Sequence, residues 1–130
     1  MGNLVDTLSI AASGMKAQAE RLRFVSENIA NEDTPGFRRK LTTFEEVVTA
    51  GERTGTVQTG PVELDRSALA RIHDPGNPLA DQTGYYDGSN VDLVVEIADA
   101  REAQRSYEAN LRVFDQARQM SQNILDLLKR

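Results

Sequence analysis

The feature that most constrains this chain is a ladder of apolar residues at each of its two ends. Near the amino terminus the steps alternate between four and three residues, with a single polar rung at Gln18. The rungs are Leu4, Leu8, Ala11, Met15, Gln18, Leu22, Val25 and Ile29. Such spacing is typical of a helix that presents one apolar stripe to a partner helix. The first segment is therefore predicted to form a long helix that packs against another helix.

A second ladder follows near the carboxyl terminus. Its rungs are Leu93, Ile97, Ala100, Ala103, Tyr107, Leu111, Phe114, Ala117, Met120, Ile124 and Leu128. Their mean period is close to 3.5 residues, again a coiled-coil value. Asn90 or Asp92 is expected to cap this helix, and the charge of Glu96 in its first turns suits the helix dipole.

Two features modify the first helix. A proline disfavours helical geometry in the residue before it, so Thr34-Pro35 should end the helix near Asn31. Gly14 is a poor helix former that costs about 1 kcal/mol relative to alanine. It has two interpretations of equal weight: a tolerated weakness, or a point where the backbone comes close to a neighbour.

The middle of the chain, residues 38–91, has many turn residues and only short β-like runs. Residues 41–48 fit either a short amphipathic turn or a strand. Residues 56–59 and 62–64 alternate like exposed strands across a Gly-Pro turn, and we expect them to pair as a hairpin. Residues 69–73 are a further strand candidate. The middle is expected to hold a small β element at most.

Composition and charge restrict the possible partners. Aromatic residues make up 5% of the 130 residues, which favours thin packing between helices. The net charge is −5, and the one basic cluster, Arg38-Arg39-Lys40, is interpreted as a solvated segment after the first helix. Because no basic face is clustered, nucleic-acid binding is not expected. No run approaches the roughly 18 apolar residues that span a bilayer, so membrane insertion is not expected either.

The residue pattern shows no chemical site. The chain has no cysteine, and its single histidine, His73, has no companion ligands, so a surface or strand position is favoured over a zinc site. Residues 87–92 are rich in Asp, Asn and Gly, but their glycine is second and not sixth as in a calcium-binding loop. Phosphate-binding loops and nucleophile motifs are absent from the sequence. We therefore predict no catalytic residue, no metal site, no cofactor and no enzymatic activity.

These observations predict a mainly α fold, with long N- and C-terminal helices packed as an antiparallel coiled coil and a small irregular β-containing middle segment. The expected divisions are an N-terminal helical region (residues 1–37), the middle segment (residues 38–91) and a C-terminal helical region (residues 92–130). Two Ala-rich stripes bury little area, so the helices should need further partners. The predicted assembly interface consists of Leu8, Ala11, Met15, Leu22, Val25, Ile29, Tyr107, Leu111, Phe114, Met120, Ile124 and Leu128.

Motifs at both ends resemble a known family. The N-terminal motif comprises Ser13, Gly14, Met15, Asn28, Ala30, Asn31, Thr34, Pro35, Gly36 and Phe37. The C-terminal motif comprises Asn90, Val91, Asp92, Arg105, Tyr107, Ala109 and Asn110. Together they resemble the terminal signatures of bacterial flagellar rod and hook proteins. Residues 74–85 and the short length are similar to the proximal-rod subunits of that family, with one departure at Ser89, where a proline often precedes the asparagine.

The resemblance implies a structural subunit of the flagellar basal body, located in the rod that spans the periplasm. It implies a tube with the terminal helices inside, the middle outside and a channel for exported subunits. The implied partners are other rod subunits and copies of itself, inner-membrane ring and rod-base proteins, and the flagellar type III export apparatus. The first six residues lack the basic and apolar regions of a cleavable signal peptide, in agreement with that export route.

Two alternatives stay open at this point. One is a sibling proximal-rod subunit of the same family. The other is a soluble helical adaptor whose helices lie in the groove of one partner. An adaptor would form a discrete one-to-one complex, whereas a rod subunit would form a tubular assembly with its relatives.

Overall fold

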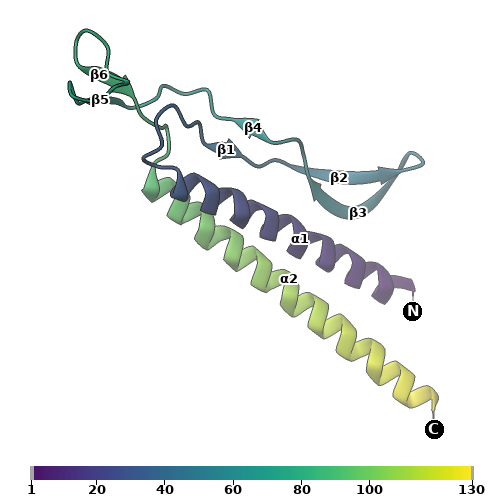
Figure 1. Cartoon of the computed structure of the whole chain (residues 1–130). Coiled ribbons are helices and arrows are strands. Elements are labelled where there is room, and N and C mark those ends of the chain that lie inside the picture. The colour runs from purple at the N-terminus through teal and green to yellow at the C-terminus, as the bar shows by residue number, and fades with distance from the viewer. Residues whose placement is uncertain (1, 130) are drawn as a thin grey trace.

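The computed structural model describes residues 2–129, as two long helices with a string of short strands beside them (Figure 1). Helix α1 spans Gly2–Ala30 and helix α2 spans Leu93–Leu128. With 29 and 36 residues, they are about 43 and 54 Å long at about 1.5 Å per residue. The helices run in opposite directions, so both chain ends lie at one end of the molecule. The prediction of two long packed helices with a small β-containing middle is confirmed, and helices cover about half of the chain.

The turn after α1 explains why that helix ends at Ala30, close to the predicted end. The Asn31 side chain donates to the carbonyl of Glu27 at 2.8 Å, and its Oδ1 accepts the Thr34 hydroxyl at 3.0 Å. Gly36 then takes a φ of +74°, which glycine adopts without steric cost. At the other helix, Asp92 is the cap, since its carboxylate accepts the N–H of Val94 at 3.0 Å.

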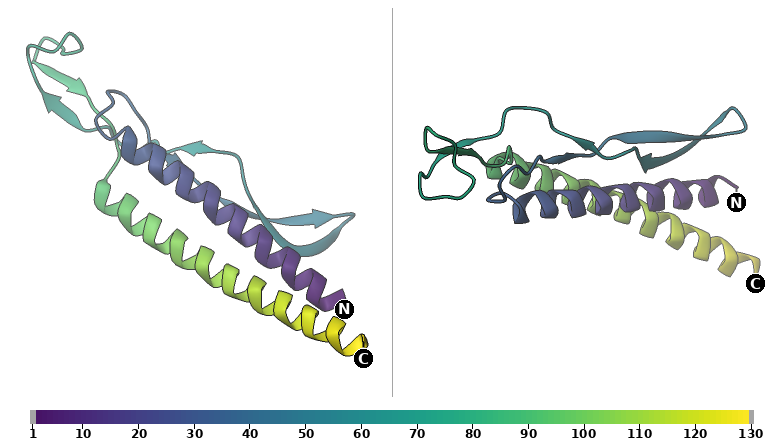
Figure 2. Two further views of the ribbon diagram at one scale, coloured as in Figure 1. Left: turned by 60° about the horizontal axis from the view of Figure 1, so that its bottom comes forward. Right: turned by 45° about the horizontal axis from the view of Figure 1, so that its top comes forward.

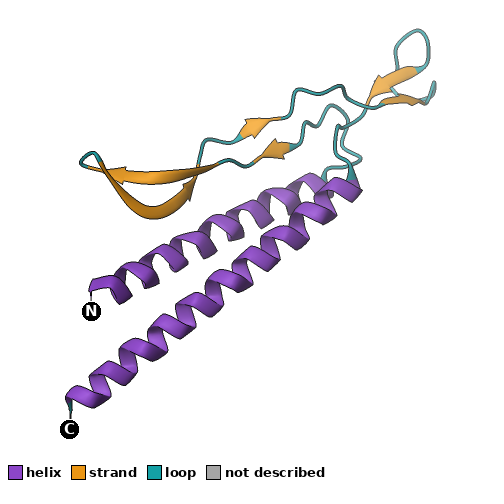
Figure 3. Cartoon of the chain, turned by 180° about the vertical axis from the view of Figure 1, so that it is seen from behind, coloured by secondary structure: helices purple, strands orange, loops and turns teal. Residues whose placement is uncertain are grey.

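The middle consists of three separate antiparallel ribbons of two strands each, drawn as arrows in Figure 3. Strand β1 (Lys40–Leu41) pairs with β4 (Glu63–Leu64), β2 (Phe44–Thr49) with β3 (Glu52–Thr59), and β5 (Arg71–His73) with β6 (Tyr85–Asp87). The predicted hairpin between residues 56–59 and 62–64 is therefore wrong. Ala50 and Gly51 take φ angles of 53° and 81°, which suit the tight turn that joins β2 to β3. Of the two interpretations of residues 41–48, the strand is correct, since most of β2 (Phe44–Thr49) lies in this segment.

Helix α1 lies between the strands and α2, in an order that both views of Figure 2 show. The β2–β3 hairpin lies along α1 on the side away from α2. The buried apolar residues are few and mostly small: Ala11, Ala17, Phe24, Val25, Ala103 and Ala117. Thin packing between helices, as the composition predicted, is what the chain adopts. No helix in residues 2–129 has the length and hydropathy needed to cross a membrane.

The β5–β6 hairpin projects from the end of the helix pair that is opposite the two termini (Figure 1). Arg71 joins its strands and loop, with ion pairs to Asp87 at 2.7 Å and Asp81 at 2.8 Å. His73 lies exposed in β5 against the ring of Tyr85, with centroids 4.7 Å apart. The strand position expected for His73 is confirmed.

Candidate assembly interface

The seam between α1 and α2 is tight at Gly14. A Cβ added there would lie 2.7 Å from Oδ1 of Asn110 and 2.8 Å from its Cγ. The Asn110 amide is held in place by its own helix, because Nδ2 donates to the carbonyl of Ser106 at 2.9 Å. The structure therefore supports the second interpretation of Gly14. Only glycine leaves room for the Asn110 side chain.

The predicted interface residues divide between this seam and the surface. Ala11 and Val25 are buried. The partly buried members are Leu8, Met15, Leu22, Tyr107, Phe114 and Ile124. Ile29, Leu111, Met120 and Leu128 are exposed, Leu128 by 74%. Packing within the chain therefore covers only a portion of the two stripes.

The exposed leucines at the end of α2 result from the offset between the helices. The contacts of Asn28 with Glu96 and of Gly14 with Asn110 keep one register along the seam. Continued in that register, α1 runs out before α2 does, and Figure 1 shows the end of α2 extending past it. Leu125, Leu127 and Leu128 are consequently exposed by 40%, 67% and 74%. We call this end of the pair, with both termini, the open end.

At the opposite, closed end lies a polar cluster that we call the hub: Asn28, Arg39, Lys40, Asn90 and Glu96. Glu96 is 0% exposed and Asn28 is 1% exposed. Oε1 of Glu96 accepts a hydrogen bond from Nε of Arg39 at 2.6 Å, and its Oε2 accepts one from Nδ2 of Asn28 at 3.3 Å. The Asn28 amide also bonds the backbone of Lys40, donating to its carbonyl at 3.1 Å and accepting its N–H at 2.8 Å. The hub thus fixes α1, α2 and β1 to one another.

Asn90 ties the loop before α2 into the hub. Its Oδ1 accepts the N–H of Arg39 at 2.7 Å, and its Nδ2 donates to the carbonyl of Asp65 at 2.9 Å. Asp65 also lies 3.4 Å from Nη1 of Arg39. Within residues 2–129 every buried side-chain nitrogen or oxygen has a hydrogen-bond partner. The cluster is therefore fully satisfied, as buried polar groups must be to avoid a large desolvation cost.

The hub overturns the prediction that Arg38-Arg39-Lys40 is a solvated run. The Arg39 side chain is only 14% exposed. Its burial acts to lower its pKa, but the hydrogen bond and charge of Glu96, helped by Asp65, outweigh burial and raise the pKa above its ordinary value. The run lies between the end of α1 and the start of α2, where the buried carboxylate needs a cation.

Two members of the hub, Glu96 and Arg39, are recognisable in the sequence but were not included in the predicted interface. Glu96 lies one heptad before the buried Ala103, so it occupies a seam position and not a solvated one. Arg39 was visible only as a member of a basic run. Phe24 and Asn28 were also missing from the predicted stripe, although both are buried.

The β2–β3 hairpin packs on α1 through contacts that the sequence pattern did not predict. Oγ of Ser13 accepts the N–H of Val57 at 3.1 Å, and the hydroxyl of Thr59 donates to the carboxylate of Glu20. Gly55 approaches Ile10 closely: an added Cβ would lie 3.0 Å from its Cδ1. These contacts occupy the face of α1 that α2 leaves open.

Most motif residues lie where the helices and the loops meet. Gly14, Met15, Tyr107 and Asn110 are buried or partly buried on the two helices, and Asn28, Asn90, Val91 and Asp92 lie at the hub or beside it. Ala30 ends α1, and Asn31, Thr34, Pro35, Gly36 and Phe37 belong to the turn that follows it. Arg105 and Ala109 are exposed on α2. Ser89, the departure from the family pattern, is buried and donates its hydroxyl to the carbonyl of Glu32.

The geometry of the hub is that of a joint between the two helices and the segment that connects them. No group of three or more His, Cys, Asp or Glu side chains in the described portion of the chain could hold a metal ion. The polar groups of the hub are engaged with one another. Both helices present exposed apolar side chains to other molecules, among them Val5, Leu111 and Leu128.

Comparison with known proteins shows which family this chain resembles. Residues 8–38 match the family model described as flagella basal body rod protein, and residues 82–127 match the flagellar basal body rod FlgEFG protein C-terminal model. The chain is 44% identical over 127 residues to the flagellar basal-body rod protein FlgC of Agrobacterium fabrum, covering 92% of this chain and 91% of that protein.

More distant relatives carry the same name. FlgC of Salmonella typhimurium is 34% identical over 130 residues, covering 95% of this chain and 97% of that protein. FlgC of Aquifex aeolicus is 34% identical over 135 residues, covering 99% of this chain and all of that protein. The resemblance stated from the terminal motifs is confirmed. The chain belongs to the FlgC family of flagellar basal-body rod proteins.

Proposed function

We propose that the chain is a structural subunit of the proximal rod in the flagellar basal body. The observation that carries this proposal is the α1–α2 pair, whose apolar stripes are only partly covered within one chain. Exposed apolar surface on a rigid helix pair marks a site of association with other proteins. The family relationship supplies the assembly to which that surface belongs.

In the proposed assembly α1 and α2 pack as an antiparallel coiled coil and line the inside of a tube. Ala11, Val25 and the partly buried stripe residues hold the pair together, while Ile29, Leu111, Met120 and Leu128 contact neighbouring subunits. Residues 1–37 and 92–130 form the assembling unit, and residues 38–91 lie outside it. Contacts that join different surfaces of successive subunits do not close, and they build helical tubes.

The proposed partners are other rod subunits, copies of this chain, and proteins of the inner-membrane ring and rod base. Delivery by the flagellar type III export apparatus belongs to the proposal. The tube would transmit torque and enclose the channel for exported subunits. The proposed role is structural and includes no enzymatic reaction.

The test is complementation of a strain of the source bacterium that lacks this gene. Cells that carry the wild-type gene should swim, and electron cryotomography of their basal bodies should show a complete rod. Cells without it should lack the rod beyond the point where this subunit enters. A complete rod in cells without the gene would contradict the proposal.

A further inference from the structure

The β2–β3 hairpin is joined to the β1–β4 ribbon through an interruption of the strand ladder. Residues 42–43 on one side and residues 60–62 on the other lie between the last pair of β1–β4 and the first pair of β2–β3. One backbone bond crosses this gap, from the N–H of Gly60 to the carbonyl of Thr43 at 2.9 Å. Pro61 follows and has no N–H with which to continue the ladder. We call these two short segments the hinge.

The two sides of the hinge are held unequally. On the β1–β4 side, the N–H of Lys40 donates to Asn28 of the hub at 2.8 Å, and the N–H of Asp65 donates to the carbonyl of Arg39 at 2.9 Å. On the other side, every residue of β2 and β3 is exposed or only partly buried. A segment with little buried surface opens locally at a lower free energy than the rest of a fold.

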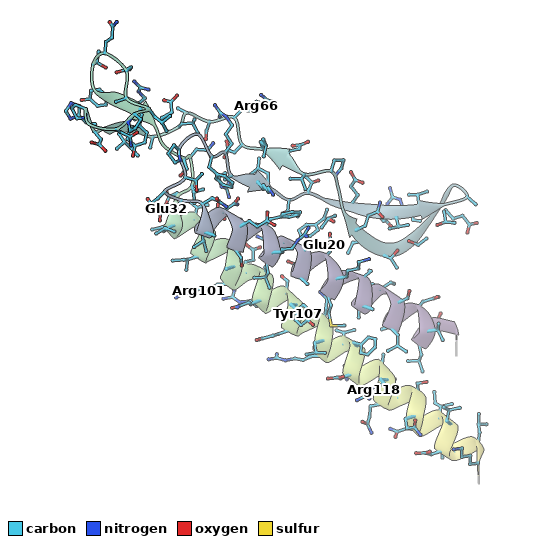
Figure 4. The ribbon with its side chains drawn as sticks, in the orientation of Figure 1. Glu20, Glu32, Arg66, Arg101, Tyr107 and Arg118 are labelled. Carbon is cyan, nitrogen blue, oxygen red and sulfur yellow. The ribbon has the colours of Figure 1, made fainter. Side chains whose placement is uncertain are left out.

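The contact between the hairpin and α1 is sparse. Within residues 2–129, two hydrogen bonds join them: Oγ of Ser13 accepts the N–H of Val57 at 3.1 Å, and the hydroxyl of Thr59 donates to Glu20. Figure 4 shows Glu20 on the side of α1 that faces the strands. A cavity of about 380 Å³, lined by these four residues and Ala17 among others, separates the remaining surfaces. Atoms that border an empty space lose their packing partners there, so this interface is weakly held.

The covered face of α1 differs from the face in the seam. Ile10, Ser13, Ala17 and Glu20 follow one another at steps of three, four and three residues, so they share the side under the hairpin. Ala17 is 3% exposed and lines the cavity, so the hairpin contributes to its cover. At Gly14, on the seam side, there is no room for one added Cβ. One face of α1 is thus closed tightly by α2, and the other is covered loosely.

We propose that the β2–β3 hairpin is a hinged strap, which lifts from α1 while the hub and the helix pair stay closed. Lifting breaks the bonds that Ser13 and Glu20 make with β3, and it exposes Ile10 and Ala17. The opening stops at the hinge, because β1 and β4 beyond it are fixed by the hub. The chain can therefore uncover a second face of α1 without unfolding the helix pair. The inference does not depend on the proposed rod function.

The test compares how two buried thiols react in the folded, full-length chain. The chain has no cysteine, so Ala17→Cys places a single thiol under the strap and Ala103→Cys, at a position 0% exposed on α2, places one in the seam. Protection is the rate of modification in the urea-unfolded variant divided by the rate in the folded one, which corrects for intrinsic reactivity. The Ala17→Cys thiol should be about tenfold less protected or more, with little dependence on urea, because local opening exposes little surface. Equal protection with the same urea dependence would overturn the inference.

Two further substitutions in these chains separate the strap from the seam. Ser13→Ala removes the acceptor of the Val57 N–H and should speed modification of the Ala17→Cys thiol about fivefold. Ser26→Ala, at an exposed serine of the same helix, is the matched control and should leave that rate unchanged. Ala117→Gly weakens α2 far from the strap, so it should speed modification of the Ala103→Cys thiol about fivefold and leave the Ala17→Cys thiol unaffected. Equal acceleration of both thiols by Ala117→Gly would show one cooperative unit without a strap.

Hydrogen exchange of the wild type locates the edge of the opening. The N–H of Val57 bonds Ser13 across the interface, so it should exchange each time the strap lifts. The N–H groups of Lys40 and Asp65 lie beyond the hinge and should exchange about tenfold more slowly or less, after correction for sequence. If these three groups exchange together, the opening includes the hub side of the hinge, and a hinged strap is ruled out.

Discussion

Asn28 and Glu96 meet in the interior at the closed end of the helix pair, where Nδ2 of Asn28 donates to Oε2 of Glu96 at 3.3 Å. A carboxylate without exposed surface requires a compensating charge, and Arg39 supplies it from the segment between the helices. The two terminal helices are thus joined directly and also through a residue that belongs to neither. Their pairing depends on the middle of the chain as well as on their own stripes.

Removing the carboxylate should destabilise the fold strongly. Glu96→Ala leaves the largely buried guanidinium of Arg39 with only the more distant Asp65 and Asp99, and it should lower the free energy of unfolding by about 3 kcal/mol. Urea denaturation followed by circular dichroism measures this change. Glu108→Ala, at an exposed site on the same helix, should change the value by about 0.5 kcal/mol or less. Equal effects of the two substitutions would contradict a structural role for the hub.

The helices were predictable because their signals are local and repeated. The ladder from Leu4 to Ile29 and the breaker at Pro35 place α1. Of the two predicted caps of α2, Asn90 and Asp92, the structure uses Asp92. The family motifs then identified the assembly. The pattern also placed Ala11 and Val25 on the stripe of α1, and both are buried within the chain.

The middle and the hub were less predictable because their contacts join residues far apart in the sequence. Arg39 reaches Glu96, and Ser13 on α1 reaches Val57 in β3, with no periodic pattern to indicate either pair. Short strands also leave pairing open: residues 62–64 looked like partners of residues 56–59, but β4 pairs with β1 instead. In a thin structure with few buried apolar residues, such individual polar contacts decide how the middle lies on the helices.

Adding a methyl group at Gly14 should reveal how closely the helices approach. Gly14→Ala would normally stabilise a helix by about 1 kcal/mol, but here the new Cβ would overlap the Asn110 amide. We expect Gly14→Ala to lower the free energy of unfolding by about 1 kcal/mol, because Asn110 must give up its bond to Ser106. Asn110→Ala in the same chain should recover most of this loss, and a double-mutant cycle by urea denaturation measures the coupling. Strictly additive effects would show that the two residues do not meet.

Charges placed in the helix stripes should abolish assembly. Leu22→Asp or Phe114→Asp puts a carboxylate at a partly buried position on a helix, where removing the charge from water is costly. Strains that carry either substitution should be non-motile and should lack a complete rod in electron micrographs. Val62→Asp, an exposed position in the loop before β4, is the matched control and should leave motility unchanged. Normal motility of the Leu22→Asp and Phe114→Asp strains would show that the stripes are not interfaces.

Acid should loosen the β5–β6 hairpin only well below the ordinary pKa of an aspartate. The Thr83 hydroxyl lowers the pKa of Asp81 most, followed by the N–H of Tyr85, with Arg71 adding to the effect. Since the pKa is lowered in the folded chain, the contribution of Asp81 is fully present above its ordinary value of 3.8 and is lost as the pH falls through the lower folded value. The amide resonances of Thr83 and Tyr85 should therefore stay constant from neutral pH to below 3.8 and shift only in stronger acid.

Two variants check that assignment by the same measurement of amide shifts against pH. Asp81→Asn cannot titrate, so the acid-induced shift of Thr83 and Tyr85 should disappear. Asp74→Asn, in the same loop but without a side-chain bond to either amide, should leave the wild-type curve unchanged. A wild-type midpoint at or above 3.8 would mean that Asp81 gains nothing from these bonds in the folded chain. A midpoint well below that value would show that the Asp81 carboxylate stays charged and bonded to Thr83, Tyr85 and Arg71 in the folded hairpin.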